Sequence, residues 1–544
     1  MHHRRRVGAQ PAGRSSRFLS TRRDVLKAGL FGSAALALPL QRAVHAQSVL
    51  DDRMPASRLP RPFTVPFRVP PVAVPVSTAG DEDRYRIRIR ETRAEILPGF
   101  QTTVWGYDGQ VPGPTIKVRQ GRKTKVRFVN ELPLKHPTLG FTPWTSVHLH
   151  GSASLPQFDG YASDITFPGE YKDYHYPNFQ PARTLWYHDH GVHHTAENVM
   201  MGQAGQYHLS DPREDALRLP RGEFDVPLII SDRLFTKTGE FLFDTNDHSG
   251  MYGDVILVNG APWPAMKVKR RKYRFRVLNG SVSRAYEYAL STGDPFTVIG
   301  TDGGLMPHPQ TVTRMRHIMA ERYEIVIDFA KYKPGTRVVL QNRNPPNNVA
   351  YPDIDKIMAF DVTDQPFDPA NNEIPDALFP DNPVMTLQPR ESVATRHLRL
   401  QRQDGLWTVN GTTWDKIVES GFTFTEANPR RGTAEIWELE NRSGGWQHPL
   451  HIHLIDFKLL DRNGRPPFPY ELGPKDVVYL GENETVRVIA KFEGVGKYMI
   501  HCHNLVHEDH DMMTQFEVVD PAARGDDPLV ARARSTSLEA GDPL

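Results

Sequence analysis

The sequence has little cysteine, almost no excess of basic charge and no apolar run long enough to cross a membrane. Cys502 is the only cysteine among 544 residues, so no disulfide can form within the chain. The apolar run at residues 28–40 is shorter than a bilayer requires. The net charge is only +2, and no basic stripe follows the chain. We therefore expect no internal disulfide, no nucleic-acid partner and no stable membrane anchor.

The first 46 residues are typical of an export leader. Residues 21–27, TRRDVLK, resemble a twin-arginine signal, and an apolar run and a small-residue site ending at Ala46 follow it. We expect cleavage there, export of a folded protein by the twin-arginine machinery and a periplasmic or secreted location. The leader holds nine basic residues and one acidic residue, so the mature chain has a net charge of −6.

Three turns at equal spacing predict an internal repeat. Asp108-Gly109, Asn259-Gly260 and Asn410-Gly411 each precede a predicted strand, and consecutive glycines lie 151 residues apart. Short β-branched strands separated by Gly, Pro and Asn turns are typical of β-sandwiches. The clearest of them are expected at residues 123–129, 273–278 and 434–439. No long amphipathic helix stands out, so we predict an all-β fold of three consecutive Greek-key sandwiches.

The repeat also predicts the domain boundaries. Residues 47–83 form a proline-rich extended segment after the leader at 1–46, and the sandwiches are expected at 84–212, 213–363 and 390–519. Residues 364–389, rich in Asp, Asn and Pro, are expected to link the second domain to the third, and 520–544 to form a disordered tail. The middle domain lacks any His-x-His pair, so we interpret it as a spacer between its neighbours.

The sequence is organised around His501-Cys502-His503. The apolar and aromatic run before it predicts a buried strand that continues into the tripeptide. Side chains alternate between the two faces of a strand, so His501 and His503 are expected on one side and Cys502 on the other. One tripeptide then serves two metal sites. A thiolate, two imidazoles and a distant thioether are the ligands of a blue copper centre, and Cys502, His507 and Met512 supply three of these four donors.

Four His-x-His pairs predict a second metal centre. The pairs are His148 and His150, His188 and His190, His451 and His453, and His501 and His503. Imidazole suits copper, and eight such donors are too many for one ion but right for three. His448 stands three residues before His451, across Pro449, and we expect that proline not to continue a strand ladder. We therefore assign His448 to the thiolate copper as the missing imidazole.

These segments resemble the copper-binding signatures of three-domain multicopper oxidases. Residues 446–457 and 501–513 resemble most those of bilirubin oxidases and bacterial spore-coat laccases, and the resemblance runs through all three predicted domains, which it identifies as cupredoxin domains. It implies four coppers per chain. The implied type 1 ligands are His448, Cys502, His507 and Met512. The implied type 2 ligands are His148 and His451, and the implied type 3 ligands are His150, His188, His190, His453, His501 and His503.

This resemblance implies an oxidase of organic electron donors. It would take single electrons from donors such as bilirubin or phenols at the type 1 copper and reduce O₂ to water at the cluster of three. Cys502 is bonded through the chain to His501 and His503, which provides a short covalent path between the two centres. The cluster takes its ligands from the first and third domains, so bound metal should hold those domains together. We expect O₂ and small-molecule donors as partners and favour a monomer.

Three more residues are candidates for a role in turnover. Asp159 and Glu508 match acidic positions that the family uses to feed protons to the cluster, and both stand close to ligands in the sequence. The alternative for Asp159 is an Asp-Gly turn, and for Glu508 a solvated charge. Trp446, two residues before His448, resembles the Trp-x-His arrangement of bilirubin oxidases. It is interpreted as a contact for the donor, with an aromatic packed in the core as the alternative.

Rival functions share part of this pattern. A cuprous oxidase in periplasmic copper tolerance has the same metal core, but such proteins usually add a methionine-rich insert, which the sequence does not show. A non-enzymatic cupredoxin scaffold would have lost ligands, whereas all twelve are present. A copper nitrite reductase has no need of a trinuclear cluster. Oxidation of Cu(I) compared with organic donors separates the first alternative from our prediction, and the copper content separates the second.

Overall fold

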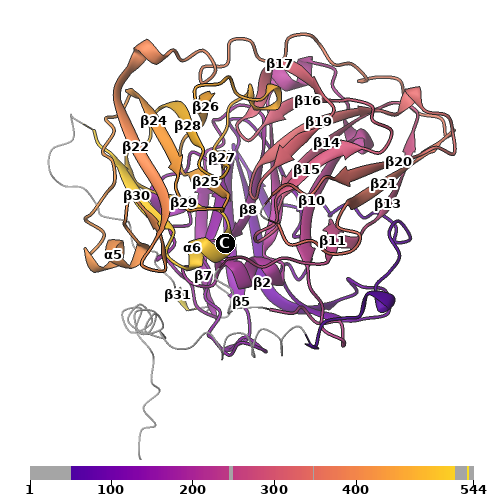
Figure 1. The fold of residues 1–544 in the computed structure, drawn as a ribbon, viewed down its shortest axis with the longest axis horizontal. Helices are drawn as coiled ribbons and strands as arrows, with labels where there is room; N and C mark the ends of the chain where they lie inside the picture. Colours follow the sequence, from indigo (N-terminus) through magenta and orange to yellow (C-terminus); the bar gives the residue numbers. More distant parts are fainter. Residues whose placement is uncertain (1–50, 244–248, 347, 521–535, 538–544) are drawn as a thin grey trace, which may run out of the picture. The chain divides into compact units, whose positions relative to one another are not determined.

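Strands form where apolar residues alternate with charged ones. In β2 (Glu82–Ala94), Tyr85, Ile87 and Ile89 are buried and the residues between them are exposed, which is the period of two that places one face of a strand in a core. The computed structural model describes residues 51–243, 249–346 and 348–520 and the backbone of 536–537 (Figure 1). The predicted leader lies outside the described residues.

Two sheets form a first sandwich. Its strands are β1 (Ser77–Ala79), β2, β3 (Thr102–Tyr107), β4 (Ile116–Arg119), β5 (Lys123–Glu131), β6 (Val147–His150), β7 (Glu170–Tyr176), β8 (Arg183–Asp189), β9 (Ala204–Ser210) and β31 (Thr536–Ser537). One sheet has the order β1-β2-β5-β7-β31, with β3 also paired to β2, and the other has the order β4-β9-β8-β6. Strand β31 pairs with β7 from within the predicted disordered tail, a pairing that the sequence did not predict.

The second sandwich uses the middle of the chain. Its strands are β10 (Asp225–Arg233), β11 (Val255–Val258), β12 (Ala261–Pro262), β13 (Ala265–Lys269), β14 (Lys272–Asn279), β15 (Tyr286–Leu290), β16 (Phe296–Thr301), β17 (Gly304–Val312), β18 (Met315–His317), β19 (Arg322–Asp328), β20 (Arg337–Asn342) and β21 (Lys356–Thr363). The two sheets have the orders β12-β11-β10-β14-β19-β16-β17 and β13-β21-β20-β15-β18.

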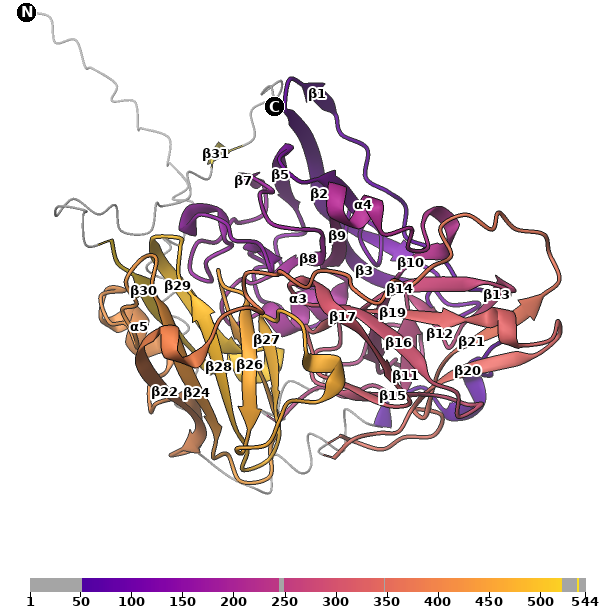
Figure 2. The same ribbon diagram turned by 90° about the horizontal axis from the view of Figure 1, so that it is seen from above.

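The third sandwich follows an irregular segment. Its strands are β22 (Ser392–Gln403), β23 (Leu406–Val409), β24 (Ala434–Asn441), β25 (His448–Ile452), β26 (Phe457–Arg462), β27 (Val477–Leu480), β28 (Thr485–Lys491), β29 (Gly496–Cys502) and β30 (Met513–Val518). The sheets have the orders β23-β22-β24-β28-β26 and β27-β25-β29-β30. Figure 2 shows both of these sheets, in orange and yellow, to one side of the second sandwich.

The strands predicted from the repeat are confirmed. Residues 123–129, 273–278 and 434–439 lie within β5, β14 and β24. The repeated turns are also alike, since both residues of each turn have positive φ, for example 50° at Asn259 and 75° at Gly260. Asn and Gly tolerate this left-handed conformation better than other residues do. The all-β prediction is therefore confirmed, and the domain boundaries remain predictions.

Helices are short in the described residues. They are α3 (Thr195–Met201), α4 (Pro212–Ala216), α5 (Trp414–Glu419) and α6 (Leu505–Asp509), with single-turn 3₁₀ segments η1 (Ala56–Arg58), η2 (Pro156–Phe158), η3 (Gly222–Phe224), η4 (Phe329–Lys331), η5 (Pro389–Glu391) and η6 (Pro469–Glu471). Within these residues no helix has both the length and the apolar character that crossing a bilayer requires. One apolar cluster runs through the first two sandwiches, and the third has a core of its own.

The first and third sandwiches meet through the sheets that carry the histidine pairs. Figure 1 shows β25 and β29 beside β8. The ring of His148 on β6 lies 5.8 Å from that of His451 on β25, measured between centroids. Side chains that are some three hundred residues apart in the sequence are thus brought to one interface.

Candidate metal centres

Strand pairing places Cys502 and His501 in two different clusters. In the register of β25 and β29, Leu450 is opposite Cys502 and His451 is opposite His501. Neighbouring residues on β29 point to opposite faces, so the thiol contacts one set of histidines and the His501 ring another. The alternation predicted from the sequence is therefore present, although β29 ends at Cys502 and His503 lies just beyond it.

The first group, the cysteine cluster, consists of His448, Cys502 and His507. The Cys502 Sγ atom lies 3.2 Å from His448 Nδ1 and 3.6 Å from His507 Nδ1, and the two nitrogens are 3.2 Å apart. All three side chains are fully buried. A thiolate and two imidazoles converging on one point form the equatorial part of a blue copper ligand set.

Neighbouring groups direct the Nδ1 atoms of both imidazoles toward the thiol. His507 Nε2 is 3.1 Å from the Ser249 carbonyl oxygen, which can only accept, so Nε2 carries the proton and Nδ1 keeps its lone pair. His448 Nε2 is 2.7 Å from Ser443 Oγ. The indole of Trp407 stacks on the His507 ring at a centroid distance of 4.0 Å. Sequence reasoning missed these three neighbours, because none stands at a recognisable spacing from a ligand.

Met512 and Trp446 lie beside the cysteine cluster. Met512 is fully buried in the same apolar core as Cys502. Its amide donates to the His507 carbonyl at 2.9 Å, and its carbonyl accepts from the Cys502 amide at 3.0 Å. Trp446 is half-buried, with its ring 6.0 Å from that of His507 and nearly perpendicular to it. The role of Met512 as a ligand and that of Trp446 as a donor contact remain predictions.

One expectation about this region is wrong. Pro449 was expected to interrupt the strand between His448 and His451, but β25 runs through the proline, which pairs with Tyr479 of β27. A proline lacks only the amide donor. Its carbonyl still accepts, here from the His503 amide at 2.6 Å. This bond ties β25 to the residue that follows Cys502.

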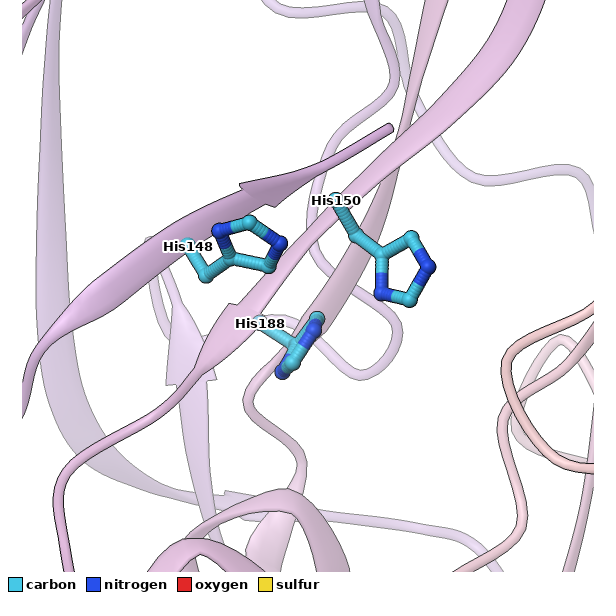
Figure 3. Close-up of side chains that lie close together, drawn as sticks. All are labelled: His148, His150 and His188. Atoms are coloured by element: carbon cyan, nitrogen blue, oxygen red, sulfur yellow. The ribbon is translucent and has the colours of Figure 1, made fainter. Parts of the chain in front are cut away.

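The second group, the histidine cluster, brings all four His-x-His pairs together. Its members are His148, His150, His188, His190, His451, His453, His501 and His503, and all are buried. Figure 3 shows His148, His150 and His188 converging from β6 and β8, and one nitrogen of each lies within 4.8 Å of those of the other two. His501 Nε2 is 3.1 Å from both His190 Nε2 and His453 Nε2. On the other side, the His503 ring is 5.1 Å from those of His150 and His188.

The protonation pattern of the cluster fits metal binding. His188 and His451 donate from Nδ1 to the carbonyls of Asp189 and Asp476, at 2.7 and 2.8 Å, and His148 donates in the same way to the Asp159 carbonyl. Their Nε2 atoms therefore keep a lone pair, and within the described part of the chain none of the three has a hydrogen-bond partner. Buried polar atoms are rarely left unpaired. Unpaired nitrogens that face one another are expected where cations bind.

Burial sets the charge state of both clusters. It holds the pKa of His448 at about 3 and that of His190 at about 4, so both imidazoles are neutral, as ligands must be. Burial also raises the pKa of the Cys502 thiol well above its usual value. The thiolate therefore needs a cation beside it, and the chain supplies none among the described neighbours of Sγ. Both observations fit a bound copper ion.

The two predicted carboxylates contact the histidine cluster. Asp159 Oδ2 accepts from His453 Nδ1 at 2.8 Å, and burial raises the pKa of this carboxyl well above its ordinary value. Glu508 Oε2 lies 2.9 Å from His501 Nδ1, and its Oε1 lies 3.4 Å from His190 Nδ1. Burial would raise the pKa of Glu508, but these two imidazoles hold it below the ordinary value. Glu508 is therefore not a solvated charge.

The middle sandwich contributes a residue that the sequence did not indicate. Asp476 Oδ1 lies 3.1 Å from His150 Nε2, and Arg322 of β19 donates from Nη1 to the same carboxylate oxygen at 2.6 Å. Both side chains are fully buried. The second sandwich is therefore more than a spacer, since Arg322 holds a carboxylate against the histidine cluster and Ser249 holds His507.

Comparison with known proteins agrees with this geometry. Residues 88–214 and 386–522 match models of the multicopper oxidase family. The chain is 43% identical over 483 residues to a bilirubin oxidase from Albifimbria verrucaria, an alignment that covers 84% of this chain and 81% of that protein. It is 33% identical to a laccase from Bacillus subtilis, over 84% and 99% of the two chains.

Solved structures show the same relationship. The laccase of Pediococcus acidilactici superposes with a TM-score of 0.75 at 30% identity and covers 86% of this chain and 96% of its own. McoA multicopper oxidase from Aquifex aeolicus has a TM-score of 0.72 at 30% identity, over 83% and 99% of the chains. With two buried clusters that fit copper, the chain belongs to the multicopper oxidase family and is a copper-dependent oxidoreductase that uses O₂.

Proposed function

We propose that this enzyme is a bilirubin oxidase or laccase-like oxidase, which takes single electrons from organic donors at the cysteine cluster and reduces O₂ to water at the histidine cluster. The observation that carries the proposal is the shared strand. Cys502 belongs to the first cluster and the adjacent His501 to the second, so the backbone joins the two centres covalently. The relatives named bilirubin oxidase and laccase support the choice of organic donors.

The proposal assigns four coppers to the chain. His448, Cys502 and His507, with Met512 as a fourth and weaker donor, would hold a type 1 copper. His148 and His451 would hold a type 2 copper. The remaining six histidines would hold a type 3 pair, one ion between His190, His453 and His501 and the other between His150, His188 and His503.

Copper, when bound, supplies reversible one-electron chemistry at both centres. The protein holds the ligands still, because the Nδ1–H groups of His148, His188 and His451 each donate to a backbone carbonyl. Asp159 and Glu508 hold the Nδ1 side of His453 and of His501, where a carboxyl can take up or release a proton. Burial favours the protonated form of Asp159, and the imidazoles favour the charged form of Glu508. We assign the two carboxyls to proton delivery.

A donor panel tests the proposal. Copper-loaded protein is expected to hold roughly four coppers per chain, to absorb orange-red light and to consume O₂ with bilirubin and with phenols without releasing peroxide. Cu(I) belongs in the same panel, because a marked preference for Cu(I) over both organic donors would instead favour a cuprous oxidase. A fully metallated protein that consumes no O₂ with any donor would refute both.

Export by the twin-arginine route is part of the proposal. Residues 21–27 carry the signal, and the mature protein would act in the periplasm or outside the cell, in our view as a monomer. Replacing Arg22 and Arg23 by lysine should leave the precursor inside a bacterial host, which fractionation and the apparent mass would show. Normal export of this variant would contradict the assignment.

A further inference from the structure

Arg402 stands apart from the other arginines of its strand. On β22, Arg396 pairs with Glu435 at 2.9 Å and Arg399 pairs with Glu440 at 2.6 Å. Arg402 is exposed, and among residues 51–243, 249–346 and 348–520 no carboxylate lies within ion-pair distance of it. Its Nε atom only approaches the Gly405 carbonyl, at 3.5 Å. Within these described residues its charge therefore has no acidic counterpart.

The place of this charge is set by the β22–β23 hairpin. Arg402 is opposite Trp407 in the register, and its guanidinium carbon lies 5.3 Å from the centroid of the indole. That indole is 1% exposed and stacks on His507. Arg402, Trp407 and His507 therefore form a stack that runs from the surface to the cysteine cluster, and the arginine is its outer layer.

An aromatic surface lies beside the stack. The ring of Trp446 is 5.7 Å from that of Trp407, and Trp446 is half-buried. Leu406, next to Trp407, is 45% exposed. A flat conjugated molecule gains from contact with a partly exposed indole, and an exposed guanidinium binds carboxylates in a bidentate manner. An acidic residue, Glu482, lies beside the loop that carries Trp446, on the side of Gly445. Its Oε1 atom would be 3.9 Å from a Cβ atom at Gly445.

We propose that Arg402 binds the acidic group of the electron donor, so that the enzyme prefers conjugated organic anions, which carry a carboxylate or sulfonate, over neutral or cationic donors. This inference rests on the proposed function and names the substrate class of the same site. Arg402 acts as a binding residue and carries no electron. The donor would place its π-system against Trp446 and its acid group on the guanidinium.

Two inorganic donors of opposite charge test the effect of Arg402 without any difference in ring contacts. In Arg402→Glu, KM for hexacyanoferrate(II) should rise about tenfold at low salt, and KM for hexaammineruthenium(II) should fall. Arg402→Lys should stay within about twofold of the parent for both donors, because the charge is kept. Arg430→Glu is the control, because it changes the net charge by the same amount but lies near Val519, at the far end of β30 from Met513. It should leave KM unchanged for both donors.

Binding of a redox-inert anion gives a readout that does not depend on turnover. Hexacyanocobaltate(III), titrated into the copper-loaded enzyme in a calorimeter, should bind about tenfold more weakly to Arg402→Glu, while the blue absorbance stays as in the parent. The inference is overturned if Arg402→Glu raises KM equally for both donors, or if Arg430→Glu changes KM in the same way as Arg402→Glu. An enzyme inactive with every donor would refute the proposed function, and the calorimetric comparison would still decide the role of Arg402.

Discussion

At the scale of single residues, Asp159 forms a turn and also contacts a candidate metal ligand through its carboxylate. It ends η2 and precedes Gly160, which has a φ of 75°, so the Asp-Gly turn is present. Its backbone carbonyl accepts from His148, and its carboxylate accepts from His453. The turn is the means by which one residue contacts histidines from two sandwiches.

We expect Asp159→Asn to keep the blue absorbance and to slow O₂ reduction about tenfold or more, because the amide still accepts from His453 but has no proton to exchange. Reoxidation of the fully reduced enzyme, followed by stopped flow, measures this step. Asp173→Asn, in which the replaced acid pairs with Arg127 and Lys125, is the control. Turnover at the parent rate would remove Asp159 from proton delivery.

Met512→Leu should raise the potential of the type 1 site, because leucine fills similar space but offers no sulfur donor. Voltammetry of the purified variant measures the shift. Met499→Leu is the matched control, since Met499 is equally buried on β29 but its sulfur accepts from the Ala162 amide at 3.3 Å. An unchanged potential in Met512→Leu would show that the thioether is not a ligand.

At the scale of elements, a turn and two short helices fix the backbone beside the two clusters. The turn after η2 passes so close to β6 that a Cβ atom on Gly160 would lie 2.4 Å from the Val147 carbonyl oxygen and 2.6 Å from His148 Cα. Helix α6 contacts α3 through Asp509, whose carboxylate accepts from the amides of Thr195 and Ala196 at 3.0 and 2.7 Å. Backbone contacts of this kind leave a ligand little freedom to move.

Gly160→Ala should therefore destabilise the protein by more than twice the amount that Gly169→Ala does. Both glycines have left-handed backbone, at 75° and 91°, but a Cβ atom on Gly169 would meet nothing within 4 Å. The control should cost about 1 kcal/mol from backbone conformation alone. Chemical denaturation compares the free energies of unfolding, and copper content shows whether His148 has moved. An equal decrease in the free energy of unfolding in the two variants would mean that β6 can shift to make room for the added methyl group at little cost.

Glu197 in α3 should make stability depend on pH. Burial raises its pKa from 4.5 to about 7, so in this window the folded chain holds a proton that the unfolded chain has lost. Stability must then fall as the pH rises through the window, by on the order of 3 kcal/mol. Glu197→Gln should melt higher than the parent at about pH 8 and equally at about pH 4. A gain of the same size at both values would show that ionisation of Glu197 is not the cause.

At the scale of the whole molecule, the three sandwiches are joined by buried charges around the histidine cluster. Arg183 of the first donates from Nη1 to both carboxylate oxygens of Asp456 of the third, at 2.9 and 2.8 Å. Arg322 of the second holds Asp476 of the third. Removing one partner of a buried ion pair strongly destabilises a protein, because the other charge is left buried and unpaired. The geometry of the cluster therefore depends on the assembly of all three domains.

Removing copper should lower the melting temperature, because a ligand that binds only the folded state stabilises it by about 4 kcal/mol at a thousandfold excess over its dissociation constant. Calorimetry of holo and chelated protein measures the difference. Cys502→Ser loses the copper of the cysteine cluster but keeps the ions between the sandwiches, so most of the stabilisation should remain. Identical melting of holo and apo protein would contradict a role of the metal in joining the domains.

Much of this protein follows from local sequence rules. The repeated Asp-Gly and Asn-Gly turns, the strands after them and the separation of Cys502 from His501 depend on residues that are neighbours in the chain, where backbone geometry alone decides. The candidate copper ligands could be named because paired histidines on strands stand at a recognisable spacing, and the family resemblance then implied which ion each would bind. Pro449 marks the limit of such rules, because its carbonyl still pairs within the sheet although its nitrogen cannot donate.

Only the tertiary structure decided what surrounds the ligands. Arg322 and Asp476 are 154 residues apart, and Arg402 gains its place from a hairpin register and a stacked indole. Hydrogen bonds and ion pairs depend on distances in space. No spacing in the sequence records which distant side chains the packing of three sandwiches will bring to about three ångströms from an imidazole.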